Sequence, residues 1–533
     1  MPTLEWTGKK AVLNHHREVP YHLLRCDEKL SIGDEGSRNL LVQGDNLLAL
    51  KALLPYYAGQ VKCIYIDPPY NSGEQTWTYN DHVDSPEMRS WLGRVVGKEQ
   101  EDLTRHSKWL CMMLPRMKLL VQFLRRDGLL FVSLDDTEAA RFRMMMEEIL
   151  PPSRYVTTLL WKSRRNLDSR HNRNVSIDHE YVMVYHGGEA RFRGAATDLS
   201  KYSNPDGDPR GPWMSDNLVG LATKERRPNL HYDLVNPETG DIYPCTAKGW
   251  RYSPETMAGK IAEGRIIWPK KKTGRPRHKK FLSDLQDEYT GFSSFVDCGN
   301  TNEGTEELQR IMGTDPFIFP KPRSLVETLI EQATEDDDLV LDSFAGSGTT
   351  GHAVLSLNKR DGKRRQFILV EMDDAIAANV TARRLQRVIA GYEYQNPRQQ
   401  LVAVPGLDGG FRYCTLGSAL FDEQGNIAGE VKFDDLAAHV YFAETGQPLP
   451  KRKNGRSPLL GVHNGVAVYL LYNGVLSDKR INGGNVLTGP VLASLPRHDG
   501  PRVIYGEGNR LGRDRLKREG IVFRQIPYEI KVG

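Results

Sequence analysis

The sequence predicts an α/β protein of more than one domain, built on a parallel sheet with helices on its faces. Two regions, 40–160 and 317–395, alternate short apolar strands with helical patterns, as parallel sheets do. Residues 161–300 between them are turn-rich, basic and aromatic, which indicates an inserted or appended recognition region. Residues 400–533 form a separate zone of short strands with Gly and Asn turns. A length of 533 residues is enough for two or three domains.

The first alternating region contains three predicted strands. NLLVQGD is followed by a helix over residues 46–57, and VKCIYID is stopped by prolines at 68 and 69. Apolar residues at helical spacing over 109–126 lead into the third strand, LLFVSLD.

The second alternating region also predicts strands that alternate with helices. SLVETLIEQA predicts a helix, DLVLDSF a buried strand, and another helix follows the glycines after that strand. QFILVEMD predicts the next strand, and AIAANVTARRLQRVIAGY a basic amphipathic helix.

Composition narrows the class of protein. With 39% hydrophobic and 26% charged residues the chain has globular composition, and its apolar stretches are too short to span a membrane. No signal-peptide run opens the sequence. The six cysteines are scattered without a CxxC pair, which argues against a disulfide framework or a zinc site and favours a reducing cytoplasm. No metal site is expected.

Two basic runs stand out against a net charge of only +4. PKKKTGRPRHKK, residues 269–280, carries seven Lys or Arg and no acid, and WKSRRNLDSRHNR, residues 161–173, carries five bases and one acid. Each run is read either as a solvated face or as a phosphate-binding surface.

The glycines of the second region match GxGxxG at Gly346, Gly348 and Gly351. Glycines let a ligand approach the backbone, and a helix that starts at Thr349 offers free N–H groups. Glu371 ends the next strand, where a carboxylate can hold the hydroxyls of a ribose. The pattern alone would also suit a nicotinamide dinucleotide. Two further residues, Phe344 in an FxGxG loop and Asp342 as a partner for the ammonium of a methionine moiety, favour S-adenosylmethionine.

The second motif is Asp67-Pro68-Pro69-Tyr70, at the carboxyl end of the strand VKCIYI, where ligands bind in open α/β sheets. An aromatic amino group is a poor nucleophile because its lone pair is delocalised into the ring. Asp67 and the Pro68 carbonyl can accept its two hydrogens and localise that lone pair for attack on a methyl sulfonium. Pro69 rigidifies the loop, and Tyr70 offers a face for an extruded base.

Together these motifs resemble the β-class amino DNA methyltransferases, above all the modification subunits of type III restriction-modification systems. The resemblance covers most of residues 38–395. Its marks are GDNLLALKAL, YIDPPYNSG, DGLLFVSLDD, HEYVMVY, NPDGDPRGPW, GRIIWP, PKPRSLVETLI and FAGSGTT.

The resemblance implies a circularly permuted, Rossmann-like methyltransferase sheet with an inserted target-recognition region and a small C-terminal α+β domain. It implies that Lys321 and Pro322 belong to a cofactor-binding motif and that Asp45 lines the adenine side of the cofactor. Asp67 in place of Ser favours adenine N6 over cytosine N4 as the target. An RNA substrate and an inactive DNA-recognition subunit remain alternatives.

The resemblance also sets the expected boundaries and partners. We expect an N-terminal extension (1–37), a catalytic part (38–160), a target-recognition region (161–316), a cofactor-binding part (317–399) and a C-terminal domain (400–533). Double-stranded DNA is the expected partner, with a restriction subunit and a second copy of the chain as further candidates, in a prokaryotic cytoplasm. Phosphate contacts are predicted for Lys162, Arg164, Arg165, Lys270, Lys271, Lys272, Arg275 and Arg277.

Overall fold

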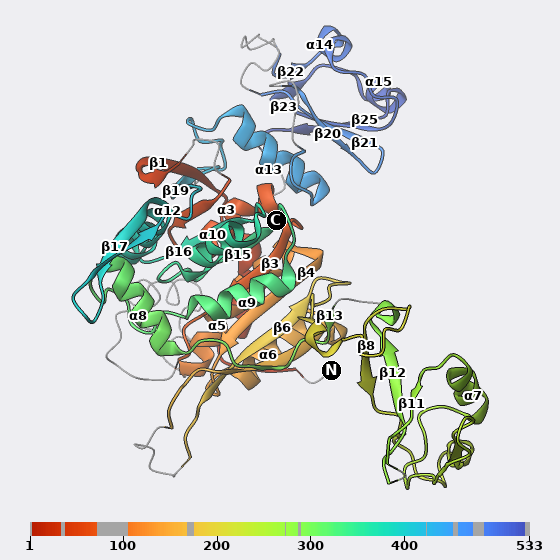
Figure 1. Ribbon diagram of the computed structural model, residues 1–533. Helices are drawn as coiled ribbons and strands as arrows, with labels where there is room; N and C mark the ends of the chain where they lie inside the picture. The colour runs from red at the N-terminus through yellow and green to blue at the C-terminus, as the bar shows by residue number, and fades with distance from the viewer. Residues whose placement is uncertain are drawn as a thin grey trace. The chain divides into compact units, whose positions relative to one another are not determined.

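The computed structural model (Figure 1) forms two compact units, residues 1–192 with 293–533, and residues 193–292. The structure describes residues 3–33, 38–71, 105–167, 175–271, 273–285, 289–422, 424–450, 457–472 and 484–527. In these ranges no helix is long and apolar enough to cross a membrane.

The larger unit is organised around one mixed sheet of ten strands, in the order β1-β19-β2-β16-β15-β3-β4-β6-β5-β14. Its parallel centre consists of β2 (Leu40–Gln43), β16 (Gln366–Glu371), β15 (Leu339–Asp342), β3 (Val61–Ile66) and β4 (Leu124–Leu134). The two motif strands, β3 and β15, are direct neighbours although they lie far apart in the sequence. The predicted α/β fold class is confirmed.

Further strands extend both sides of this centre. β6 (His179–His186) pairs antiparallel with β4, β5 (Tyr155–Lys162) with β6, and β14 (Phe295–Val296) lies parallel to β5. On the other side β19 (Phe411–Ala419) lies parallel to β2, and β1 (His22–Ile32) pairs antiparallel with β19.

Helices cover both faces of the centre. α3 (Asn46–Tyr57), α5 (Arg105–Phe123) and α6 (Ala139–Ile149) pack together, as do α9 (Arg323–Ala333), α10 (Thr349–Asp361) and α12 (Ala382–Ala390). In Figure 1, α9 runs across β3 and β4. Strands covered on both sides can be apolar throughout, which explains runs such as VKCIYI.

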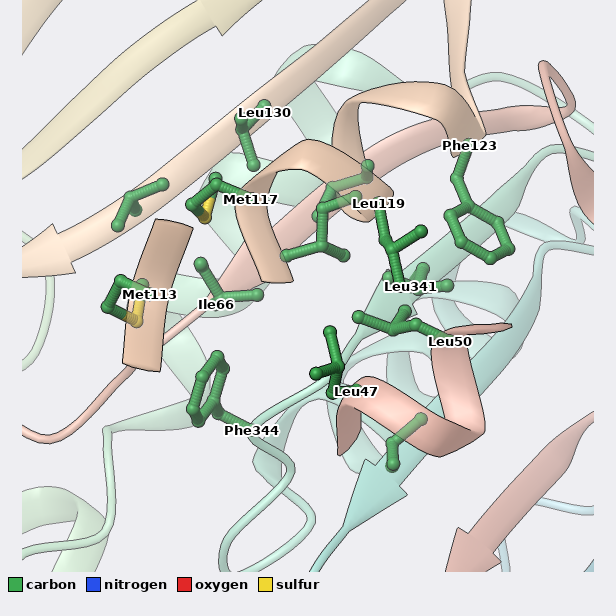
Figure 2. Close-up of a cluster of buried hydrophobic side chains, with 14 of the residues drawn as sticks. Leu47, Leu50, Ile66, Met113, Met117, Leu119, Phe123, Leu130, Leu341 and Phe344 are labelled. Carbon is green, nitrogen blue, oxygen red and sulfur yellow. The ribbon is translucent and has the colours of Figure 1, made fainter. Parts of the chain in front are cut away.

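The core on the α3–α5 side reaches up to the glycine loop. Figure 2 shows Leu47 of α3 and Met113 of α5 near Ile66 of β3, with Phe344 of the loop next to them. All four side chains are buried in one cluster. Phe344 therefore packs the glycine loop against the hydrophobic core.

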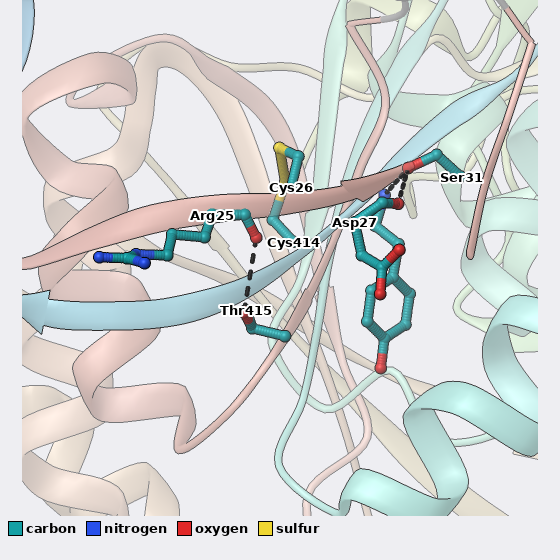
Figure 3. The surroundings of a disulfide bond; sticks show 7 residues. Arg25, Cys26, Asp27, Ser31, Cys414 and Thr415 are labelled. Atoms are coloured by element: carbon teal, nitrogen blue, oxygen red, sulfur yellow. Dashed lines mark hydrogen bonds between the residues drawn. A yellow bond between two sulfur atoms is a disulfide. The ribbon is translucent and has the colours of Figure 1, made fainter. Parts of the chain in front are cut away.

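The expectation of no disulfide is wrong for one pair. Cys26 of β1 and Cys414 of β19 stand directly opposite each other in an antiparallel register, with Cα atoms 3.8 Å apart, and form a disulfide (Figure 3). The cysteines are 388 residues apart in the sequence, so only the strand pairing reveals them as partners. Cys63, Cys111, Cys245 and Cys298 are not disulfide-bonded.

The smaller unit, 193–292, contains a three-stranded antiparallel sheet of β11 (Ile266–Ile267), β12 (Arg277–Phe281) and β8 (Trp213–Asp216). A small core around Leu218 and Trp250 includes Met257 from α7 (Pro254–Ala262).

Residues beyond β19 build a second sheet, in the order β20-β21-β23-β25. It consists of β20 (Leu459–His463), β21 (Val466–Leu470), β23 (Arg502–Gly506) and β25 (Ile521–Gln525), with helices α13 (Phe433–Thr445), α14 (Gly489–Ser494) and α15 (Arg513–Arg518).

The expected strands and helices of both alternating regions are confirmed, with two refinements. The helix predicted over 109–126 ends at Phe123, and β4 begins at Leu124. The stretch predicted as one amphipathic helix consists of α11 (Asp374–Ile376), a π-helical segment (Ala377–Thr381) and α12. The π-helical segment ends at Thr381, whose hydroxyl donates to the carbonyl of Gly346 in the glycine loop at 2.6 Å. The irregular turn therefore lies against the loop.

Candidate active site

The two sequence motifs lie at the same edge of the large sheet. Asp67 follows β3 and the glycine loop follows β15, and these strands are parallel neighbours. Parallel strands present their carboxyl ends at one edge, where α/β proteins bind ligands. Burial is the main reason for the raised pKa of Asp342 at the end of β15, and the nearby Asp67 carboxylate adds to that rise.

Four polar side chains from three parts of the chain meet after β3. The Lys321 ammonium lies 3.1 Å from Oδ1 of Asp67, donates to the Tyr70 hydroxyl at 2.7 Å and lies 3.1 Å from Oε2 of Glu180. The Tyr70 hydroxyl donates to the same Glu180 oxygen at 2.8 Å. The buried indole of Trp161 lies beside them, with its ring centroid 5.8 Å from the ammonium.

Two of these residues refine the expectation from sequence. Lys321, predicted to bind a cofactor, contacts Asp67, while its carbonyl accepts from the Thr349 hydroxyl of the glycine loop at 3.2 Å. Glu180 of β6 was not predicted as a site residue. Its only sequence signal is its position in HEYVMVY, a segment noted for its resemblance and not for its chemistry.

Hydrogen bonds from neighbouring elements hold the loop that carries Asp67 and Tyr70. Trp109 of α5 donates its indole N–H to the Pro69 carbonyl at 2.6 Å. Asn71, in the left-handed region at φ 58°, donates to the fully buried Glu138 at 2.5 Å, and His106 contacts the same carboxylate oxygen at 2.6 Å. These contacts fix the backbone on which Asp67 and Tyr70 stand.

The glycine loop has the backbone that its sequence requires. Gly346 and Gly348 have φ of 50° and 79°, a region that L side chains rarely adopt. Gly348 is the N-cap of α10, so the loop delivers its N–H groups at a helix start. The Gly346 N–H donates to Oε2 of Glu371 at 2.7 Å, which places this predicted ribose-binding carboxylate at the loop.

The other two predicted cofactor carboxylates also have protein partners. Asp342 accepts from the Phe344 N–H at 2.9 Å and the Thr350 hydroxyl at 2.5 Å, and burial raises its pKa to about 7. Asp45 caps α3 by accepting from the Leu47 N–H at 2.8 Å, and its other oxygen pairs with buried Arg116 at 3.2 Å. Pro322 is the N-cap of α9.

Buried Arg384 of α12 is hydrogen-bonded to the glycine loop. Arg384 donates to the hydroxyl of Ser347 at 3.0 Å and to the hydroxyl of Thr349 at 2.8 Å. Its other terminal nitrogen pairs with Glu307 at 3.0 Å. Glu307 belongs to α8 (Thr301–Met312) and also binds Arg323 at 2.7 Å. Sequence reasoning missed this cluster because its members come from three separate helices.

We expect Gly348→Ala to destabilise the protein more than Gly362→Ala. Both glycines have positive φ, 79° and 72°, at the two ends of α10, so both variants carry a strain of about 1–2 kcal/mol. Only at Gly348 would the new Cβ also meet a neighbour, Thr381 Cγ2 at 3.0 Å. Urea unfolding of both variants measures the difference, and equal losses would show that Thr381 yields without cost.

The predicted DNA-contacting residues divide between the two units. Lys162, Arg164 and Arg165 follow directly on Trp161 in the larger unit. In the smaller unit Lys270, Lys271, Arg275 and Arg277 are exposed, and Lys272 lies outside the described residues. Arg277 binds Ser215 at 2.6 Å. Lys279 of the same basic run is buried between Asp206 and Asp208, at 2.6 Å from each, so its ammonium is paired with carboxylates of the protein itself.

The sequence comparisons all match one class of protein. A family model described as DNA methylase matches residues 61–382. The StyLTI Mod subunit of a type III restriction-modification enzyme from Salmonella typhimurium is 33% identical over 67% of this chain and 55% of its own length. The EcoP15I Mod subunit from Escherichia coli is 28% identical over 70% of this chain and 64% of its own length. The matches thus span somewhat over half the length of these relatives.

Solved structures give more distant matches. A PvuII DNA methyltransferase described as cytosine-N4-specific aligns over 65% of this chain and 86% of its own, with a TM-score of 0.33 and 16% identity. A putative DNA modification methylase of Thermus thermophilus, complexed with S-adenosyl-L-methionine, aligns over 66% and 96%, with a TM-score of 0.30 and 15% identity.

Proposed function

Because the chain belongs to the DNA methylase family, we propose that it transfers a methyl group from S-adenosylmethionine to the N6 amino group of adenine in DNA. The observation that carries the proposal is the meeting of Asp67 and Tyr70 with the glycine loop at one edge of the sheet. That arrangement brings an acceptor for an amino group close to a loop able to hold an adenosine cofactor. The strand order, with β15 inserted between β16 and β3, supports a circularly permuted methyltransferase sheet.

The chain's own residues would do the positioning that such a displacement needs. Asp67 and the Pro68 carbonyl would accept the two amino hydrogens, while Trp109 occupies the Pro69 carbonyl and so keeps that acceptor out of competition. Tyr70 would stack on a base turned out of the duplex. The cofactor would lie along the glycine loop, with Glu371, Asp342 and Asp45 at its edges, and supplies the methyl group as a sulfonium when bound.

The choice of adenine rests on Asp67 at the head of its motif and on the resemblance to type III modification subunits. Cytosine N4 is the alternative, because its amino group presents the same two hydrogens beside a ring nitrogen. We also propose, from the Mod relatives, that the chain acts in a restriction-modification system with a restriction subunit as partner.

The test is to incubate the protein with methyl-tritiated S-adenosylmethionine and unmethylated DNA, and to separate the nucleosides after digestion. Label in N6-methyladenine nucleoside is the expected result. Label in N4-methylcytosine nucleoside would keep the reaction and overturn the base. Cofactor binding without label in any DNA, while a matched RNA is labelled, would overturn the DNA substrate.

We expect cofactor binding to release protons at pH 6 if Asp342 faces the ammonium of the methionine moiety. Burial holds the pKa of Asp342 at about 7, so the group is mostly protonated at pH 6, and a nearby cation would ionise it. Affinity should therefore rise with pH up to about 7 and then level off. Calorimetry in two buffers of different ionisation enthalpy counts the protons. The isosteric Asp342→Asn should release none from this site, and equal release in both proteins would assign the proton elsewhere.

A further inference from the structure

The contacts of Lys321 place a cation on the carboxylate that we propose receives the target amino group. An ammonium has three N–H donors. Here they face Asp67 at 3.1 Å, Tyr70 at 2.7 Å and Glu180 at 3.1 Å, so the two acids and the phenol surround it. Lys321 is 12% exposed at its side chain, which makes this a built site and not a surface pairing.

Burial disfavours the ionised form of Asp67, so a neighbouring group must stabilise its charge. A carboxylate removed from water favours its protonated form, and Glu180 beside it adds repulsion. A protonated Asp67 would present a hydroxyl where the reaction needs an acceptor. The Lys321 cation opposes both effects, so the pKa of Asp67 is raised less than it would be without this neighbour. Burial lowers the pKa of Lys321, but the two acids raise it above its usual value and keep the ammonium charged.

We propose that Lys321 and Glu180 are positioning residues for methyl transfer: Glu180 anchors the Lys321 ammonium, and that ammonium holds Asp67 charged and aimed at the incoming amino group. The inference rests on the proposed function and adds to it the two residues that prepare the acceptor. In the reaction the sulfur–methyl bond breaks, a nitrogen–methyl bond forms, and the methylated nitrogen then loses one proton. An ionised Asp67 binds the amino hydrogens before transfer and can take that proton afterwards.

The groups that face Asp67 come from several elements. Tyr65 and Tyr70 belong to β3 and the loop after it, Glu180 to β6, Lys321 to the segment before α9, and Asp342 to the end of β15. Lys321 is the cation of this set. Its removal therefore leaves Asp67 among acids and phenols, and the pKa of Asp67 should rise.

The test measures single-turnover methylation of DNA against pH for the wild type and Lys321→Met. The wild-type rate should rise with pH through the pKa of Asp67, and in Lys321→Met this acidic limb should move about 1–3 pH units higher. The methionine variant should regain much of its rate at high pH, and Lys321→Arg should keep the limb near the wild-type position. Lys359→Met, which removes an exposed lysine paired with Asp408, is the control for loss of a positive charge.

Glu180→Gln in the Lys321→Met background gives the second measurement. Once the cation is gone, Glu180 only repels Asp67, so the double variant should have its acidic limb below that of Lys321→Met alone. S-adenosylmethionine affinity should change less than about threefold in every variant that keeps its fold by circular dichroism, well under the tenfold that 1.4 kcal/mol represents.

The outcomes separate this inference from the function on which it rests. An unshifted limb in Lys321→Met, or a loss of cofactor affinity that accounts for its whole defect, would overturn the positioning role and return Lys321 to a cofactor contact. A limb that moves still higher in the double variant would overturn the electrostatic coupling of Glu180 to Asp67. A wild-type protein that labels no DNA would overturn both the function and the inference.

Discussion

Replacing Asp67 with alanine is expected to lower the single-turnover rate of methyl transfer by at least about 10²-fold. Asp67 follows β3 at the edge of the sheet where the glycine loop lies, and its Oδ1 is held by Lys321 at 3.1 Å. Without the carboxylate the target amino group loses an acceptor that would localise its lone pair. The Lys321 cation would also be left facing that amino group, which disfavours the positive charge that develops on nitrogen.

The measurement is a rapid-quench assay with labelled cofactor at saturating DNA and cofactor concentrations. Asp67→Asn keeps the shape but not the charge, and it should lose nearly as much as alanine. Asp136→Ala, an exposed carboxylate just beyond β4 that accepts from Tyr181, is the matched control and should stay near the wild-type rate. Cofactor affinity should be kept in all three variants. A tenfold or smaller loss in Asp67→Ala would show that the backbone acceptor alone is sufficient.

The parts of the site that could be predicted from sequence are those encoded within one stretch of chain. The strand VKCIYI followed by Asp67, and the strand DLVLDSF followed by glycines, each carry their structural context with them. The positive φ of Gly346 and Gly348 is the same kind of local requirement. For these features hydrophobic pattern and backbone sterics act between close neighbours in sequence.

What could not be predicted depends on which strands and helices become neighbours. Glu180 reaches the site only because β6 pairs antiparallel with β4 next to β3. Cys26 and Cys414 meet only through the pairing of β1 with β19. Lys321 was located near the site by its motif, but its contact with Asp67 is a matter of side-chain direction. No spacing in the sequence carries that information.

The Arg384 cluster also depends on which helices become neighbours, because it joins three helices to the glycine loop through buried charge. Replacing Arg384 with methionine is expected to lower the free energy of unfolding by about 3–5 kcal/mol, the cost of breaking a buried ion pair by removing one partner. Methionine keeps the apolar stem but leaves the Ser347 and Thr349 hydroxyls without this donor and Glu307 with one strong partner fewer. Burial raises the pKa of Glu307, but the Arg384 and Arg323 guanidinium groups help to bring that pKa below its usual value.

Arg383→Met is the matched control, since Arg383 is the preceding residue of α12 and is exposed. Its effect on stability should stay within about 0.5 kcal/mol. Urea midpoints of both variants at equal m values give the comparison, and S-adenosylmethionine should protect Arg384→Met less than the wild type because its loop is no longer held. A loss below about 1 kcal/mol with normal protection would mean that the loop keeps its shape through Gly346, Glu371 and Thr381 alone, and that Arg384 follows the loop instead of fixing it.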